Sequence, residues 1–151
     1  MDTFDKILNT NLRSAVLLTS LATPYLIETK GNIVNVSSVA GSTPPRAPFH
    51  AYSVSKVALD HFTKGAASEL ASSGVRVNVV SPGPVKTDII ENGGLPATWD
   101  EFAADTALGR ASESEEISEL ILFLASDKAK GITGSNYVTD NGYLIKASVP
   151  Q

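Results

Sequence analysis

The first part of the chain, residues 2–28, carries apolar side chains at helical spacing. Residues three and four positions apart share one face of a helix, so this pattern predicts an amphipathic helix. One polar residue, Asn11, continues the apolar line, and burying an unpaired amide costs about 1–3 kcal/mol. Asn11 therefore either has a specific role or bonds a neighbouring backbone carbonyl. The apolar positions are Phe4, Ile7, Leu8, Leu12, Ala15, Val16, Leu18 and Leu21.

Two short apolar runs, residues 32–36 and 75–80, predict strands. The first run does not alternate cleanly between apolar and polar positions, which favours a parallel sheet covered on both faces. Gly31 is expected to end the preceding helix or to form the turn before the strand. A helical segment, residues 51–73, lies between the two strands, and its small residues permit close approach of another helix.

The last third of the chain predicts one more helix and one more strand. The sequence Ser112-Glu-Ser-Glu115 is a capping-box pattern that opens a helix. The predicted strand, residues 135–139, follows a glycine-rich turn and ends at Asp140-Asn141-Gly142, where Asn141 can take the left-handed backbone conformation. Residues 88–110 are long and weakly patterned, which is typical of a lid or binding loop.

Composition narrows the classes of protein. The 151 residues suit one domain, residues 1–151, and 42% hydrophobic with 19% charged residues fits a globular chain. A net charge of −4 without a basic run argues against nucleic acid or an anionic membrane as partner. No apolar stretch approaches the roughly 18 residues that span a bilayer. The cytoplasm is the expected location, although a targeting segment can precede Met1.

Metal and thiol chemistry are not expected. The chain has no cysteine and two histidines, His50 and His61, and no acidic or histidine cluster has the spacing of metal ligands.

Three residues are candidates for proton transfer. Tyr52 and Lys56 are four apart and share a helix face, and Ser38 follows the strand at 32–36, where open parallel sheets place their chemistry. An ammonium within about 4–6 Å lowers the pKa of a phenol from about 10. Ser37 is the alternative to Ser38, and a solvated Tyr–Lys contact is the alternative to a site.

A second candidate segment follows the strand at 75–80. Pro82 stops the strand, and Gly83 lets the backbone pass close to a ligand at the sheet's carboxyl end. The alternative is that Pro82-Gly83 is only a turn.

These segments together resemble the short-chain dehydrogenase/reductase family, in overall look its 3-oxoacyl-carrier-protein-reductase-like members. The motifs are Asn9-Thr10-Asn11-Leu12, residues 32–38 with Gly41, Tyr52-x-x-x-Lys56 and residues 75–87, and the resemblance runs from about residue 2 to residue 145. Several motifs in the right order are stronger evidence than any single one. The resemblance implies an α/β fold: the C-terminal part of a Rossmann-like three-layer αβα fold, with about three parallel strands and helices on both faces.

The resemblance also implies an NAD(P)(H)-dependent oxidoreductase that interconverts a carbonyl and an alcohol in a small molecule, with NADP or NAD as cofactor. It implies that Tyr52 is acid or base, that Lys56 lowers its pKa and bonds the cofactor ribose, and that Ser38 binds the reacting oxygen. Asn11 would hold a water that relays protons to the lysine. The implied cofactor contacts are Tyr52, Lys56, Pro82, Gly83, Val85 and Thr87.

The family assembles through the helices that match residues 2–28 and 51–73, so a homodimer or homotetramer is expected. The family's glycine-rich turn, which holds the cofactor pyrophosphate, does not occur in this sequence. The alternative function is therefore a truncated, catalytically incompetent dimerisation or interaction module. In that reading the strand at 32–36 is a sheet edge with unpaired backbone groups.

Overall fold

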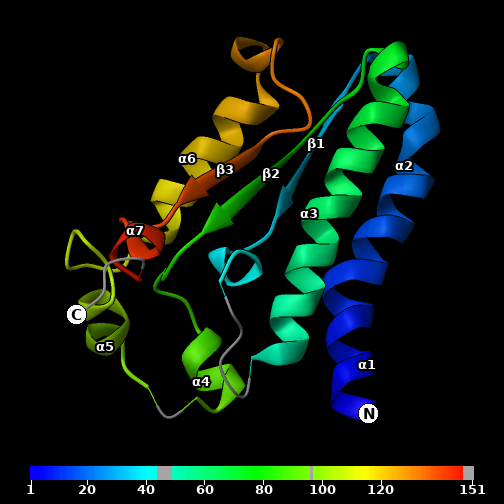
Figure 1. Cartoon of the computed structure of the whole chain (residues 1–151). Coiled ribbons are helices and arrows are strands. Elements are labelled where there is room, and N and C mark those ends of the chain that lie inside the picture. Colours follow the sequence, from blue (N-terminus) through cyan, green and yellow to red (C-terminus); the bar gives the residue numbers. More distant parts are fainter. Residues whose placement is uncertain (44–48, 96, 148–151) are drawn as a thin grey trace.

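A parallel sheet of three strands, in the order β1-β2-β3, forms the centre of the protein. The computed structural model describes residues 1–43, 49–95 and 97–147. The strands are β1 (Asn32–Val36), β2 (Arg76–Pro82) and β3 (Asn136–Thr139), paired in register at Asn35 with Val79 and at Val80 with Tyr137. All three arrowheads point toward the same end of the sheet (Figure 1), so the carboxyl ends of the strands share one edge.

Helices cover both faces of this sheet, which confirms the three-layer αβα arrangement. The helix pair α2 and α3 lies on one side and α6 on the other (Figure 1). The α-helices are α1 (Asp2–Leu8), α2 (Ser14–Thr29), α3 (His50–Leu70), α4 (Ile89–Gly93), α5 (Trp99–Ala104), α6 (Ser114–Ala125) and α7 (Tyr143–Ala147). Short 3-10 turns are η2 (Val39–Gly41), η3 (Ala71–Ser73) and η4 (Asp127–Ala129).

Strand β2 is buried on both faces, and its apolar side chains belong to two separate hydrophobic clusters. Val77, together with Val75 just before the strand, packs against Ala66 of α3, whereas Val80 packs against α6 residues such as Leu124. Successive side chains of a strand point to opposite faces, and both faces of β2 are covered by helices. The polar side chains on the face of Val80, Arg76 and Asn78, donate to the Leu124 and Ile132 backbone carbonyls.

The first helix is not uniform, in contrast to the single helix predicted for residues 2–28. A π-helical segment, η1 (Asn9–Arg13), separates α1 from α2, and Asn11 lies within it. A π-helical turn holds one extra residue and is frequent at functional sites. The π-helical segment could not be predicted from the apolar spacing, because this spacing is helical on both sides of the segment.

Three local predictions can be compared directly with the structure. The left-handed conformation of Asn141 is confirmed by its φ of 51°. Helix α2 ends at Thr29, next to the predicted end at about residue 28, and Lys30, with φ 51°, takes the left-handed conformation after it. At Gly31 there is no room for a side chain, because a Cβ there would lie 2.7 Å from Leu26 Cδ2.

The capping box of α6 is shifted by one residue from the predicted Ser112 and Glu115. Glu113 is the N-cap, and its reciprocal partner is Glu116. Ser112 is buried, and its Oγ accepts a hydrogen bond from Asn141 Nδ2 at 2.9 Å. The pattern suits either register, and the burial of Ser112 against the C-terminal turn decides between them.

None of the helices in the described part of the chain combines the length and apolar character needed to cross a bilayer.

Candidate active site

Ser38, Tyr52 and Lys56 come together just beyond the carboxyl end of β1. Ser38 is the N-cap of η2, where its Oγ accepts from the Ala40 N–H at 3.1 Å. Tyr52 and Lys56 lie in the first two turns of α3. The Tyr52 hydroxyl is hydrogen-bonded to the Ser38 side chain, and Lys56 Nζ lies 5.5 Å from the centre of the Tyr52 ring.

The two serines that follow β1 point to different partners. Ser38 faces Tyr52, whereas Ser37 Oγ donates to the Lys56 backbone carbonyl at 3.2 Å and is itself buried. The geometry therefore puts Ser38, rather than Ser37, beside the candidate acid–base residue.

The expected effect of Lys56 on Tyr52 is not found in this structure. Burial raises the pKa of Tyr52, and the hydrogen bond to Ser38 lowers it by less. The Lys56 ammonium lies over the ring and donates to the Val36 carbonyl at 2.9 Å. Burial disfavours a phenolate because it removes the water that would stabilise the charge. In this arrangement Tyr52 holds its proton at neutral pH.

The pKa of Lys56 is also shifted by its surroundings. Burial lowers the pKa of Lys56, and the negative charge of Asp60, one turn further along α3, raises it. The sequence reasoning missed Asp60, because a single carboxylate on a helix is usually a solvated residue.

Asn11 is tied to the same helix. Its Nδ2 donates to Ser55 Oγ at 3.1 Å, and Ser55 Oγ in turn donates to the Tyr52 backbone carbonyl at 2.6 Å. Ser55 is fully buried and directly precedes Lys56. The Asn11 amide thus donates to a side chain of another helix and not to a neighbouring backbone carbonyl. Ser55 was also missed, and its only sequence signal is its place between Tyr52 and Lys56.

Pro82 and Gly83 end β2 beside the last strand. The Gly83 N–H donates to the Thr139 carbonyl at 3.0 Å, and a Cβ on Gly83 would lie 2.8 Å from the Asp140 Cα. The close approach that requires glycine here is to the end of β3, whereas the predicted contact with a ligand stays a prediction.

Val85 and Thr87 continue from this turn toward α4. Val85 forms an isolated parallel bridge with Ser112, in which the Lys86 N–H donates to the Ser112 carbonyl at 2.9 Å. In a parallel bridge the flanking residues make the bonds, so the N–H and carbonyl of Val85 itself point away from Ser112. The Thr87 hydroxyl is exposed and lies 3.5 Å from the Val85 carbonyl. The Val85 carbonyl and the Thr87 hydroxyl therefore lie side by side in this segment.

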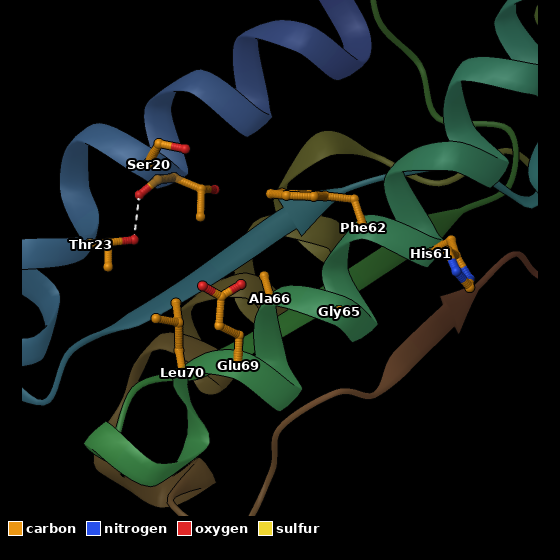
Figure 2. A pocket seen from close by; sticks show the side chains of 9 residues that line it. Ser20, Thr23, His61, Phe62, Gly65, Ala66, Glu69 and Leu70 are labelled. Carbon is orange, nitrogen blue, oxygen red and sulfur yellow. Dashed lines mark hydrogen bonds between the residues drawn. The ribbon is translucent and has the colours of Figure 1, made fainter.

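Two surface hollows lie away from these residues. One, of about 350 Å³, lies between α2 and α3 and is lined from one side by Ser20 and Thr23 and from the other by Phe62 and Glu69 (Figure 2). The other, of about 370 Å³, lies between α2 and the β1 edge. Among the residues that the structure describes, no group of three or more histidine, aspartate or glutamate side chains could hold a metal ion.

The sequence is similar to those of known reductases and dehydrogenases. The family described as enoyl-(acyl carrier protein) reductase matches residues 1–144. The 3-oxoacyl-(acyl-carrier-protein) reductase of Thermotoga maritima is 38% identical over 146 residues, which are 94% of this chain and 57% of that protein.

Solved structures of dehydrogenases and reductases are also similar to this chain. A short-chain dehydrogenase/reductase of unknown function from Caenorhabditis elegans, crystallised with cofactor, superposes with a TM-score of 0.89 at 35% identity, covering 95% of this chain and 56% of that one. A mutant 4-hydroxyisoleucine dehydrogenase complexed with NADH and succinate gives a TM-score of 0.84 at 34% identity, covering 95% and 60%. The chain thus spans little more than half the length of the proteins it matches, which is consistent with the C-terminal part of such an enzyme.

Proposed function

The chain belongs to the short-chain dehydrogenase/reductase family, and we propose that it carries the proton-transfer site of an NAD(P)(H)-dependent oxidoreductase that interconverts a carbonyl and an alcohol. The observation that carries this proposal is the hydrogen bond between Tyr52 and Ser38 with the Lys56 cation over the Tyr52 ring. A hydroxyl pair beside a cation, at the carboxyl edge of a parallel sheet, is suited to exchanging a proton with a substrate oxygen.

Tyr52 is the acid when a carbonyl is reduced. Burial raises its pKa, so the phenol carries a proton at neutral pH and can give it to the oxygen that becomes an alcohol. Ser38 donates a hydrogen bond to the same oxygen and stabilises the charge that develops there. NAD(P)H supplies the hydride when it is bound.

Lys56 and Asn11 support Tyr52 from α3 and from the π-helical segment. The Lys56 ammonium, held by the Val36 carbonyl at 2.9 Å, is a proton reservoir beside the phenol and a donor for a ribose hydroxyl. Asn11, through Ser55, fixes the helix turn between Tyr52 and Lys56 and lies where it can hold a relay water.

The nicotinamide end of the cofactor would be bound by the segment after β2. Pro82 and Gly83 set the turn, the Val85 backbone bonds the carboxamide, and the Thr87 hydroxyl bonds a carboxamide or phosphate oxygen. The choice between NADP and NAD is made elsewhere in the family, in a segment that this sequence does not contain.

The substrate is a small carbonyl compound or alcohol, held between Tyr52 and the region 88–110. That region contains α4 and α5 in the structure, and its Thr98 and Glu101 form a capping box that fixes the start of α5. Trp99 and Phe102 pack with ring centres 5.8 Å apart, which gives this region an aromatic face.

Cofactor titration followed by the fluorescence of Trp99 tests the proposal, because Trp99 is the single tryptophan of the chain. Saturable quenching at micromolar NADPH or NADH, with oxidation of the cofactor in the presence of a ketone, supports an enzyme. No change up to millimolar cofactor contradicts a competent enzyme.

A second candidate function is a dimerisation or interaction module. Two observations favour it: β1 is an edge of the sheet, with Val36 44% exposed, and α2 presents large apolar side chains to solvent. Several large apolar side chains exposed on one helix are typical of an interface. The α2 residues concerned are Leu17, Leu18, Leu21 and Tyr25, which are 56%, 65%, 62% and 71% exposed.

The partner in this reading is a second copy, joined through the helices of residues 2–28 and 51–73 as a homodimer or homotetramer. The hollow between α2 and α3 (Figure 2) is lined by other residues of these two helices and offers a further recess for a partner's side chains. Sedimentation velocity without cofactor separates the readings, since a module should sediment above the monomer mass while showing no quenching by NADPH.

A further inference from the structure

Asp60 is a partly buried carboxylate on α3, one helical turn after Lys56. Its Oδ1 is buried without a hydrogen-bond partner among the described residues. Its Oδ2 lies 3.4 Å from Nδ2 of Asn136 in β3, a residue 76 positions away. A buried carboxylate oxygen without a donor is costly, so its retention calls for a compensating interaction nearby.

The groups around Asp60 come from three elements. Burial raises the pKa of Asp60, whereas a hydrogen bond from Ser37 and then the charges of Lys64 and Lys56 lower it. The lysines are the charged groups that act on it, and both favour its ionised form. The facing groups are Lys56 and Lys64 of α3, Ser37 and Gly41 from the β1–η2 segment, and Asn136 of β3.

Asp60 and Lys56 each shift the pKa of the other. Burial lowers the pKa of Lys56, and Asp60 is the group that opposes this effect. Because Lys56 Nζ donates to the Val36 carbonyl at 2.9 Å, Asp60 acts on the ammonium through space. A carboxylate in a partly buried position is screened less by water than one on the surface, so such an interaction has a measurable size.

Asp60 also meets the segment that carries Ser38. The Ser37 hydroxyl lies between the Lys56 carbonyl, at 3.2 Å, and the Asp60 carboxylate, and its one proton serves one of these acceptors at a time. A Cβ on Gly41 would lie 3.3 Å from Asp60 Oδ2, so η2 passes directly against the carboxylate. The segment before α3 and the face of α3 are therefore joined at Asp60.

We propose that Asp60 is a positioning residue of the candidate site: its carboxylate, one helical turn from Lys56, favours the charged form of that ammonium and anchors the β1–η2 segment, with Ser38, against α3. The catalytic meaning of this role rests on the proposed function. Its electrostatic part belongs to the chain alone and needs neither cofactor nor substrate.

The test is an NMR titration of lysine labelled with ¹³C at Cε, with Lys56→Met used to assign the resonance. Asp60→Asn should lower the pKa of Lys56 by about 0.5 or more, because it removes the opposing charge at nearly constant shape. Glu69→Gln is the matched control, since it makes the same charge change at an exposed position of the same helix. It should change the pKa of Lys56 by less than about 0.1. Equal effects of the two variants would overturn the proposal.

A measurement on the unaltered chain covers the case in which Asp60→Asn fails to fold. The Lys56 Cε resonance should show a second, small inflection at the pH where the Asp60 carboxyl, followed by its own ¹³C label, titrates. A flat response there overturns the proposal.

Turnover separates this inference from the proposed function. In an active protein, Asp60→Asn should move the alkaline limb of the pH–rate profile to lower pH by the same amount as the pKa of Lys56. A shifted Lys56 titration in a chain without turnover supports the role of Asp60 and contradicts the enzyme.

Discussion

Asn11, in the π-helical segment, donates a hydrogen bond at 3.1 Å to Ser55, the residue that directly precedes Lys56 in α3. The two residues are 44 positions apart in the sequence. Ser55 Oγ in turn donates a hydrogen bond to the Tyr52 backbone carbonyl at 2.6 Å. The two helices that flank the candidate site are therefore locked together at the turn that carries its tyrosine and lysine.

Removing the Asn11 amide should loosen this connection. Asn11→Ala leaves the buried Ser55 hydroxyl without its donor, and we expect a loss of about 1–3 kcal/mol in the free energy of unfolding, measured by urea denaturation. Asn9→Ala, at an exposed position of the same π-helical segment, is the control and should cost clearly less. Equal losses for the two variants would mean that the Asn11–Ser55 bond contributes nothing specific.

The Tyr52 hydroxyl is the group on which the proposed reaction depends. Tyr52→Phe keeps the ring under Lys56 and should reduce kcat by about 100-fold or more, because general acid–base catalysis by a positioned group is worth that much. Steady-state kinetics with NADPH and a ketone measures the loss. Tyr25→Phe, whose side chain is 71% exposed on α2, should leave the rate unchanged. Undiminished turnover by Tyr52→Phe would remove Tyr52 from the mechanism.

Ser38 should tune the ionisation of Tyr52. The hydrogen bond from Ser38 lowers the pKa of Tyr52 against the larger effect of burial, so Ser38→Ala should raise that pKa further. Tyrosine labelled with ¹³C at Cζ and titrated from pH 8 to 12 reports the change. The exposed Ser42 provides the control variant, Ser42→Ala, which should have no effect. A pKa that falls in Ser38→Ala would contradict the direction of this hydrogen bond.

The same raised pKa has a consequence for stability. The folded protein binds the phenolic proton more tightly than the unfolded chain, whose tyrosine titrates at about 10. This contribution is therefore fully present below pH 10 and is lost as the pH rises through the folded-state pKa. The unfolding free energy of Tyr52→Phe should depend less on pH above 10 than that of the parent, as measured by denaturation at pH 9 and pH 11.

The apolar face of α2 should mediate self-association. Leu18→Glu places a charge where a partner helix would pack, and we expect the apparent mass by sedimentation velocity to fall to that of the monomer. Leu122→Glu is the matched control on α6, because Leu122 is 62% exposed and Leu18 is 65% exposed. A chain that is monomeric before substitution, or unaffected by it, would contradict an interface on α2.

Much of the fold could be predicted from the sequence, because the signals for it are local. The apolar runs placed β1 and β2, and helical spacing placed α3 and α6. The π-helical segment could not be predicted, since Asn11 sits on a helical face in either conformation and its partner Ser55 lies on another element. The capping register of α6 was likewise decided by the burial of Ser112 against Asn141.

The sequence by itself determined that Tyr52 and Lys56 share a helix face, because four residues make about one turn of any α-helix. It also placed Ser38 at the working edge of the sheet. Only the tertiary structure decided what these groups do to one another: packing buries the phenol, turns the ammonium toward the Val36 carbonyl and brings Asp60 beside both Ser37 and Asn136. The reason is physical, since spacing along a chain fixes which side chains are neighbours, whereas loss of water around a charge depends on every element that packs over it.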